Sequence, residues 1–375
     1  MYRPDSNHHN RPAARLHYPC GEAPAPGQAF EIAPGVLWMR LPLPNVLSHI
    51  NVWAIEDGEG WAIVDTGVHT PQSVEAWQML LEGPLGGRPV TRVLVTHQHP
   101  DHVGMAGWLT ERFGCPLWMT RLEYLHSLAT VAETGQEVPR EGLDFYRRAG
   151  WDDGALDGYR QRFGRAGRMI SRLPRSYRRL NDGETLRIGA HTWQVLTGQG
   201  HTPEHACLYS HELAVLIAGD QILPRISPNV SVHPMEPEAN PFAGWQASLS
   251  RFRRLVPDDV LVLPAHNDPF EGLHARLDRF EQSLWRDRAR LRNALGEPRR
   301  AIDLFGVLFA APVAANDALQ YALATGETVA YLNYLQVLGD IDVRIDEAGV
   351  AWYRAVAAIE VPPASSTPTE AALPT

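Results

Sequence analysis

The chain has 375 residues, of which 44% are hydrophobic and 21% charged, a composition typical of a globular protein with a sizeable core. Its 34 basic residues, all of them arginine, are outnumbered by 43 acidic residues, so the formal net charge is −9. A net negative chain is a poor general ligand for nucleic acid, and the lack of lysine excludes Schiff-base chemistry and lysine-dependent phosphate loops. No apolar run approaches the roughly 18 residues of a membrane span.

The sequence favours a reducing compartment. Its first residues are polar and lack the basic-then-apolar layout of a secretory signal. The three cysteines, Cys20, Cys115 and Cys207, are odd in number and far apart, which argues against a disulfide framework. We therefore expect a cytoplasmic protein.

Strands dominate the first 270 residues, with helices between them. Residues 1–27 are rich in Pro, His and Ala and predict a flexible lead-in. Short apolar bursts from residue 30 to 65, with turn residues at 57–60, predict strands, and Thr70 followed by Pro71 predicts the start of a helix. Further elements are a helix at 103–113 and strands at 92–96, 116–120, 185–188, 192–196, 206–209, 214–218 and 260–263. Helices so spaced cover sheet faces, so residues 28–270 are interpreted as one layered α/β domain.

Two segments depart from this pattern. Residues 121–180 are interpreted as a helical insertion rich in arginine, with eleven Arg against five acidic residues between positions 140 and 179. Residues 271–358 have helical periodicity and end in a hairpin signal at 346–349, a combination that resembles a winged-helix module. The remaining residues, 359–375, are rich in Pro, Ser, Thr and Ala and predict a disordered tail.

The strongest chemical signal is the motif His97-Gln98-His99-Pro100-Asp101-His102, which follows a predicted strand. Side chains at alternate positions of an extended chain share one side, so His97, His99 and Asp101 are expected to point together where the strand ends. His102 opens the next helix and reaches the same space from another direction. Such a group of imidazoles and a carboxylate is typical of a metal site, and chance clustering explains it poorly behind a buried strand.

This cluster needs partners from elsewhere, and the chain offers three that each follow a predicted strand. They are His201 in Gly-Gln-Gly-His-Thr-Pro, Asp220 in Ala-Gly-Asp, and His266 in Leu-Pro-Ala-His-Asn. Asp65, in Val-Asp-Thr-Gly, ends an earlier strand in the same way. Taken singly, each is more often a turn residue than a ligand, and their shared placement at strand ends makes them candidates.

Taken in order, these residues resemble the five motifs of the metallo-β-lactamase-fold hydrolase superfamily, over about residues 30–270. The resemblance implies an αββα sandwich with two metals at one edge between the sheets. It implies that His97, His99 and His201 bind one metal, while Asp101, His102 and His266 bind the second. Asp220 would bridge both metals, and Asp65 would order the metal-binding loop by hydrogen bonds. The C-terminal module is similar to the winged-helix-like extension of some thioesterase relatives, the glyoxalase II type among them, and of some ribonuclease relatives.

The ligand set suits two Zn²⁺ ions, which would share a water and lower its pKa from ~15.7 toward neutrality. The resulting bridging hydroxide would attack the substrate, with Asp101 both binding metal and orienting it, and Asp65 supporting the site. Iron or manganese suit the same ligands, and a mononuclear iron dioxygenase acting on sulfur compounds is one alternative. The diiron flavoprotein branch has Glu where this chain has His99.

Four further residues stand near these motifs. Glu204 and His205 follow the Gly-Gln-Gly-His-Thr-Pro motif that contains His201. His205 is interpreted as a hydrogen-bonded structural residue, with ligand orientation or substrate contact as the alternative. His233 and His69 lie beyond two of the predicted site residues, and for both a loop or helix-cap role is favoured over substrate contact.

The arginine-rich insertion lies between the central motif and His201, where it would roof a cavity built from loops at one sheet edge. Arginine clusters recognise carboxylate or phosphate, so the insertion predicts a small anionic substrate. The alternative is a solvated or subunit-facing helical pair with no specific role, which leaves a homo-oligomer open.

The first functional hypothesis is therefore a zinc-dependent hydrolase of small esters, above all thioesters, with no membrane or nucleic-acid partner. A phosphodiesterase or ribonuclease of the same fold is the second, although residues 298–358, with four Arg against seven acidic residues, lack a basic face. The third is a non-catalytic ligand-binding sensor, against which the complete ligand set argues.

Overall fold

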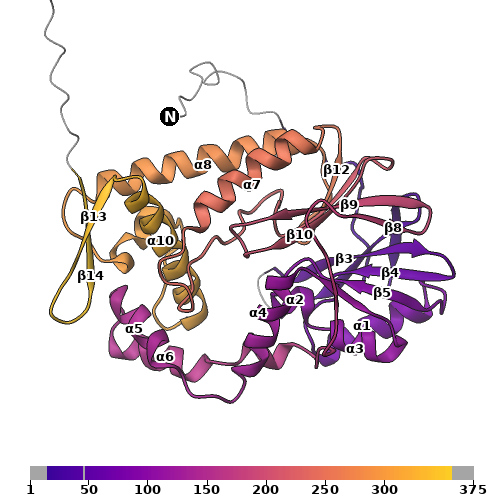
Figure 1. Ribbon diagram of the computed structural model, residues 1–375, viewed down its shortest axis with the longest axis horizontal. Coiled ribbons are helices and arrows are strands. Elements are labelled where there is room, and N and C mark those ends of the chain that lie inside the picture. The colour runs from indigo at the N-terminus through magenta and orange to yellow at the C-terminus, as the bar shows by residue number, and fades with distance from the viewer. Residues whose placement is uncertain (1–14, 45–46, 357–375) are drawn as a thin grey trace, which may run out of the picture.

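The computed structural model describes residues 15–44 and 47–356 (Figure 1). The predicted tail at 359–375 and residues 1–14 of the predicted lead-in lie outside these described residues. Residues 15–27 of that predicted flexible segment contact the body of the protein. The backbones of His17 and Glu271 form a β-bridge, and their side chains pair at 2.9 Å. This part of the segment is therefore held by specific contacts, which its composition did not reveal.

The first sheet, within the described residues, has seven strands that follow one another in chain order. β1 to β4 are paired antiparallel, and β4 to β7 are paired parallel. The predicted turn at 57–60 is confirmed, because Asp57 pairs with Gly60. The strands are β1 (Ala29–Ala33), β2 (Val36–Pro42), β3 (His49–Asp57), β4 (Gly60–Val64), β5 (Val90–Leu94), β6 (Leu117–Met119) and β7 (Arg178–Arg179).

The second sheet has five strands in the described part of the chain, in the order β12-β11-β10-β9-β8. Neighbours are antiparallel except for β11 and β12, which are parallel and therefore end at the same edge. The strands are β8 (Thr185–Ile188), β9 (His191–Gly198), β10 (His205–Ser210), β11 (Val215–Gly219) and β12 (Leu261–Pro264).

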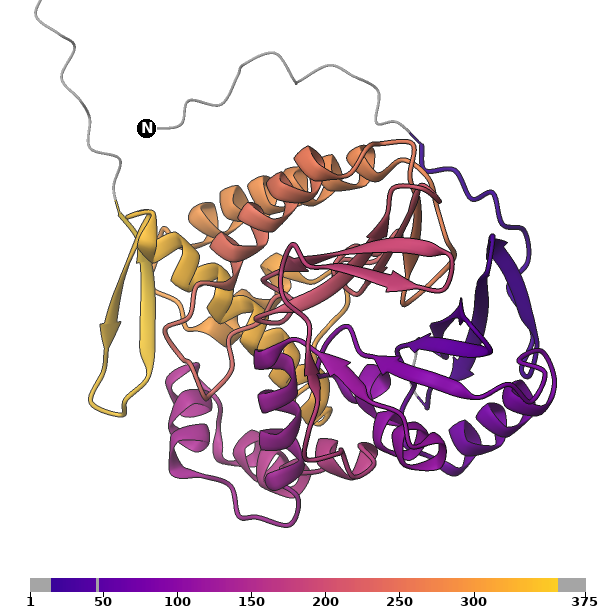
Figure 2. The ribbon, with the colours of Figure 1, turned by 45° about the vertical axis from the view of Figure 1, so that its right-hand side comes forward.

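The two sheets face each other across an apolar layer. Trp38 and Trp53 from the first sheet and Trp193 from the second are each at most 1% exposed and belong to one buried cluster. The outer face of the first sheet is covered by α1 (Pro71–Glu82) and α3 (Ala106–Phe113), as Figure 2 shows. The outer face of the second is covered by α7 (Pro241–Leu255) and α8 (Leu273–Ala294). The predicted αββα sandwich is confirmed.

The local start and stop signals are mostly as predicted. α1 begins at Pro71, with the Thr70 hydroxyl accepting the Ser73 N–H. β5 ends two residues before the predicted strand 92–96 does, because the Thr96 N–H donates to the Asp65 carboxylate rather than to a neighbouring strand.

The predicted helix at 103–113 is wrong in its first part. The chain forms a short helix, α2 (Pro100–Val103), and restarts as α3 at Ala106. Between them the Met105 N–H donates to the Gly67 carbonyl, and the Gly104 carbonyl accepts the Ser171 N–H. These two contacts with distant segments replace hydrogen bonds of a continuous helix.

The insertion forms α4 (Arg121–Ala132), α5 (Arg140–Arg148), α6 (Asp153–Arg162) and the 3₁₀ helix η1 (Ala166–Met169). The C-terminal module begins with α8 and continues with η2 (Ala301–Leu304), α9 (Phe305–Leu308), α10 (Ala318–Val337), β13 (Ile341–Ile345) and β14 (Ala351–Ala355). The last two strands pair as the predicted closing hairpin. None of the helices in the described residues is long and apolar enough to cross a membrane.

Two helices of the insertion, α5 and α6, pack against this C-terminal module. The Trp151 indole donates to Thr325 Oγ1 of α10 at 2.9 Å, and its ring centroid lies 4.8 Å from that of Tyr321. Phe145 and Tyr159 join the same buried cluster. α5 and α6 therefore support α10, a partnership that the sequence pattern did not predict.

The layer between the sheets gives the first prediction. Trp193→Ala should lower the free energy of unfolding by about 3–5 kcal/mol, because Trp193 is 0% exposed and its removal leaves a cavity between the sheets. Trp193→Phe should lower it less, since it keeps a ring and removes an indole N–H that has no hydrogen-bond partner among the described residues. Denaturant unfolding measures both, and equal losses would contradict the packing argument.

Candidate metal centre

Seven of the predicted site residues meet at one edge of the sandwich. The segment 96–99 is bent and 100–103 is helical, so curvature of this loop, and not strand alternation, brings its side chains together. The other three residues come from loops that follow β9, β11 and β12. The seven form two groups, and within each group the ligand atoms all lie within 4.8 Å of one another. The first group is His97, His99, His201 and Asp220, and the second is Asp101, His102 and His266.

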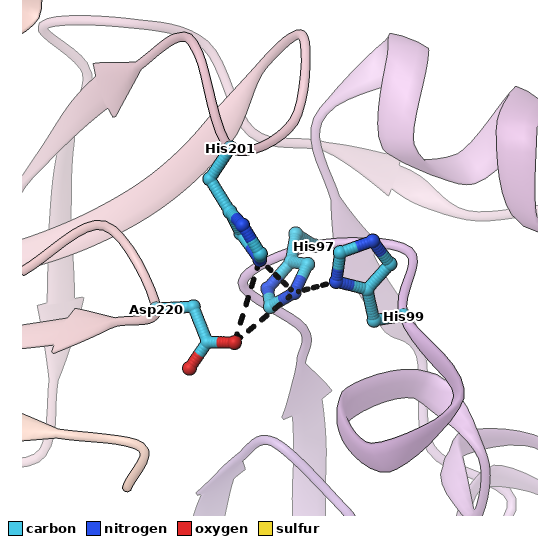
Figure 3. Close-up of side chains that lie close together, drawn as sticks. All are labelled: His97, His99, His201 and Asp220. Carbon is cyan, nitrogen blue, oxygen red and sulfur yellow. Dashed lines mark hydrogen bonds and ion pairs between the residues drawn. The ribbon is translucent and has the colours of Figure 1, made fainter. Parts of the chain in front are cut away.

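The first group has the spacing of ligands around one ion (Figure 3). His97 Nε2 lies 2.9 Å from His99 Nδ1 and 3.3 Å from His201 Nε2. Asp220 Oδ2 lies 3.4 Å from His201 Nε2 and 3.9 Å from His97 Nε2. Tetrahedral ligands with metal bonds of about 2.0–2.1 Å are about 3.3–3.4 Å apart. These four residues are therefore able to hold a metal ion.

The second group has similar spacing and shares Asp220 with the first. Asp101 Oδ2 lies 3.3 Å from His266 Nε2 and 3.8 Å from His102 Nε2. Asp220 Oδ1 lies 3.4 Å from His266 Nε2, and its Oδ2 lies 3.5 Å from His102 Nε2. Asp220 thus faces both groups, as a carboxylate that bridges two ions must.

Three histidines are fixed from outside through Nδ1. His201 Nδ1 donates to the Asn229 carbonyl at 2.8 Å, and His266 Nδ1 donates to the His49 carbonyl at 3.0 Å. His102 Nδ1 pairs with Asp65 Oδ2 at 2.8 Å. A carbonyl oxygen only accepts, so Nδ1 carries a proton in the first two rings, and in the neutral form of each ring Nε2 turns a lone pair toward the centre.

Three of the atoms that face the centre have no hydrogen-bond partner in the described part of the chain. His102 Nε2, His266 Nε2 and Asp220 Oδ1 are buried, and none has a hydrogen-bond partner among the described residues. Buried polar atoms without partners are rare and cost free energy, and facing lone pairs repel one another unless a cation lies between them. The imidazole and carboxylate donors present therefore fit a pair of divalent metal ions.

The electrostatics favour the ligating state for the two carboxylates and for His99. Burial alone would raise the pKa of Asp220, but the charges of His266 and His102 hold it well below its usual range. Burial would also raise the pKa of Asp101, and His102 and His266 lower it to about 2. Burial lowers the pKa of His99 to about 3. Ionised carboxylates and a neutral imidazole are the forms that bind metal near pH 7. Burial would lower the pKa of His102 and of His266, but the carboxylates of Asp65 and Asp220 raise that of His102, and Asp220 raises that of His266, so a bound ion would displace a proton from each ring.

Asp65 lies behind the cluster and does not face it. It is 1% exposed and has a left-handed backbone with φ of 60°. Its Oδ1 accepts the Thr96 N–H at 2.8 Å, and its Oδ2 pairs with His102. Both oxygens are engaged, so Asp65 holds the loop and orients His102, the ordering role that the resemblance implies.

His205 is part of the packing around the site. Its ring is fully buried and stacks on His97 at a centroid distance of 4.8 Å, and its Nε2 accepts the Asp220 N–H at 3.1 Å. Gly219 has φ of 52°, and a Cβ there would lie 2.6 Å from His205. The favoured structural interpretation of His205 therefore agrees with its contacts.

The other three candidates do not join the cluster. Glu204 Oε2 accepts the Leu122 N–H at 2.8 Å at the start of α4. His69 is exposed and directly precedes the N-cap of α1. His233 is exposed in the long loop between β11 and α7.

Glu123 is a supporting residue that the sequence analysis missed. It is 0% exposed in the first turn of α4, and its carboxylate accepts the Gln98 N–H at 3.0 Å and the Glu204 N–H at 2.8 Å. It thereby ties the loop of His97 to the loop of His201. Nothing in the local pattern of an insertion rich in charged residues marked this glutamate.

Asn51 was also missed, although it stands in a predicted strand of apolar residues. Its Nδ2 donates to the Pro264 and Asn267 carbonyls at 2.8 and 2.7 Å, on either side of His266. Its Oδ1 accepts the Trp38 indole N–H and the Arg40 guanidinium. A lone amide inside an apolar strand was the available signal.

The arginines of the insertion do not form one group over the centre. Arg140 and Arg147 pair with Asp144 on the exposed side of α5. Arg168 and Arg172 are exposed and, within the described residues, have no ion-pair partner. Arg168 and Arg172 lie on a segment that reaches α2. The Ser171 hydroxyl of this segment donates to the carbonyl of Gly104, which directly follows α2.

The fold and the two-group edge site define a metallo-hydrolase of the αββα type. A family model described as "Metallo-beta-lactamase superfamily" matches residues 46–266, and one described as "Metallo-beta-lactamase-like, C-terminal domain" matches residues 289–356. The chain belongs to the metallo-beta-lactamase superfamily.

Known proteins share this fold over most of the chain. A solved beta-lactamase domain protein from Burkholderia ambifaria is 39% identical, with a TM-score of 0.83 over 91% of this chain and 98% of that one. The probable metallo-hydrolase YqjP of Bacillus subtilis is 22% identical over 85% of this chain and 94% of its own. Hydroxyacylglutathione hydrolase GloC of Haemophilus influenzae is 21% identical over 57% of this chain and 82% of its own.

The role of Glu123 gives the second prediction. Glu123→Gln should lower the free energy of unfolding by about 1–3 kcal/mol, because an amide NH₂ would face one of the two backbone N–H groups that the carboxylate accepts. The variant should also retain less metal, since the loops of His97 and His201 lose their common anchor. Glu141→Gln, an exposed change on α5, is the control. Unchanged unfolding and metal content in Glu123→Gln would contradict the role.

Proposed function

We propose that this protein is a dinuclear metal-dependent hydrolase of small esters, above all thioesters. The observation that carries the proposal is the convergence of seven candidate ligand side chains, together with three buried inward atoms, His102 Nε2, His266 Nε2 and Asp220 Oδ1, that have no hydrogen-bond partner among the described residues. His97, His99 and His201 would hold one ion, and Asp101, His102 and His266 the other. Asp220 would bridge them. Zinc suits these ligands, with iron or manganese as alternatives.

Divalent ions bound there would supply Lewis acidity and a water whose pKa is near neutral. The chain's own part is to fix the ligands and to handle the proton. Asp101, whose side chain is 20% exposed, is the cluster carboxylate most open to solvent. With a pKa of about 2 it stays ionised, so it can orient the attacking water and accept a hydrogen bond from it.

The thioester assignment rests on chemistry and on a relative. A hydroxyacylglutathione is a thioester, and a relative that carries this hydrolase name is 21% identical over 57% of this chain. A thioester needs little assistance to its leaving group, because a thiolate leaves readily. We therefore rank thioesters above phosphodiesters as substrates. The proposal also includes a cytoplasmic location, which agrees with Cys20, Cys115 and Cys207 being free thiols.

The metal roles give the third prediction. His97→Ala and His266→Ala should each abolish turnover and the binding of a metal equivalent, because each removes a ligand from a different group. The loss should exceed the roughly 10–100-fold that follows removal of an outer partner of a ligand. Elemental analysis, turnover and far-UV circular dichroism would be measured together. His191→Ala, at the opposite end of β9 from His201, is the control.

Unchanged turnover in either ligand variant, with the fold intact, would disprove the assigned roles. The substrate class is tested by a panel of thioester, lactone, β-lactam and phosphodiester substrates on the metal-loaded protein. We expect thioesters to be cleaved with the highest kcat/KM. Efficient RNA cleavage without thioester cleavage would replace the proposal with the nuclease alternative, and metal binding without any turnover would favour the sensor.

The anionic nature of the substrate gives the fourth prediction. Arg168→Ala with Arg172→Ala should raise KM for anionic substrates more than for neutral ones, because these two exposed guanidinium groups lie on the segment that packs beside α2. Arg140→Ala with Arg147→Ala, which removes two arginines already paired with Asp144, should change neither KM. An equal effect of the Arg168 and Arg172 changes on anionic and neutral substrates would contradict a role in binding anions and would leave the segment with a packing role only.

A further inference from the structure

The C-terminal module contacts the segment that follows Asp220. This segment, residues 221–240, joins β11 to α7 and lies against α10. The Val232 N–H donates to the Gly326 carbonyl at 3.0 Å. A Cβ at Gly326 would lie 2.8 Å from the Val232 carbonyl oxygen, so only glycine allows this approach. α10 and the segment are therefore in backbone contact.

One side-chain contact continues from α10 to a proposed metal ligand. Glu327 Oε2 accepts the Asn229 Nδ2–H at 2.8 Å, and the Asn229 carbonyl accepts His201 Nδ1–H at 2.8 Å. The Asn229 side chain is held on its other side by the Ser231 hydroxyl. Two hydrogen bonds thus join the C-terminal module to the ring of His201.

Glu327 lies in partly buried, acidic surroundings. Glu327 lines a cavity of about 200 Å³ together with Asp287, Phe242 and Tyr331. Burial and the nearby Asp287 raise the pKa of Glu327 to about 7, against the hydrogen bond from Asn229. The ionised and the protonated carboxyl both present an acceptor oxygen to Asn229, so the link does not require a charge.

We propose that Glu327 is a positioning residue for metal binding, which acts on His201 through Asn229. By fixing Asn229, it places the carbonyl that holds the His201 Nδ1 proton, and Nε2 is then directed to the ion. This assigns a function to the C-terminal module, and it rests on the metal centre proposed above. Outer partners of metal-bound histidines typically contribute about 10–100-fold to metal affinity.

The experiment compares zinc affinities of full-length variants by competition with a chromophoric chelator. Glu327→Ala is expected to weaken the binding of one of two zinc equivalents by about 10–100-fold. Glu327→Gln keeps an acceptor for Asn229 and should bind zinc as the wild type does. Asn229→Ala should reproduce the defect, and the double variant should add little to it, since both residues belong to one link.

The matched control is Asn333→Ala. Asn333 also reaches from α10 to the 221–240 segment, donating to the Pro237 and Ala239 carbonyls at 3.0 and 2.9 Å, but its contact does not lead to a predicted ligand. We expect it to lower the melting temperature without changing zinc affinity. Wild-type zinc affinity in Glu327→Ala, or an equal loss in Asn333→Ala, would overturn the proposal. Failure of the wild type to bind zinc would instead overturn the metal centre itself.

Discussion

The site depends on the mutual repulsion of lone pairs that the fold forces together. His201 and His266 each donate the Nδ1 proton to a backbone carbonyl, so in the neutral rings their Nε2 atoms can only accept. Those atoms face the carboxylate of Asp220 at 3.4 Å, and it too can only accept when ionised. A cation between them would replace this repulsion with attraction. This explains how the buried edge of a β-sandwich can hold several lone-pair atoms that have no hydrogen-bond partner.

The surrounding structure serves to maintain that arrangement. Asp65, Glu123 and Asn51 do not face the cluster, yet each fixes a loop that carries a ligand. Gly219, with its left-handed backbone, lets the chain pass close to the ring of His205, where a Cβ would lie 2.6 Å from the ring. Many of the hydrogen bonds at this edge therefore orient the candidate ligands, and the residues that make them are far from those ligands in the sequence.

The extent to which this could be predicted follows from the range of each interaction. The central motif carries four candidate ligands within six residues, and the other three follow strands with clear apolar patterns, so the set was predictable. Glu123 and Asn51 were not, because they act on loops that lie close only after both sheets have formed. The break between α2 and α3 was missed for the same reason, since Gly67 and Ser171 supply its hydrogen bonds. The contact of the insertion with α10 depends on aromatic packing between segments about 170 residues apart, which no local pattern encodes.

The origin of the ligands in two different sheets has a consequence for folding. The chain up to β7 supplies His97, His99, Asp101 and His102, and everything after it supplies His201, Asp220 and His266. A cation bound at this edge would therefore hold the two halves of the sandwich together, and it would be tightly held only when they have closed. Ion release and separation of the two sheets would then be one linked equilibrium, in which opening releases the ions and bound ions oppose opening.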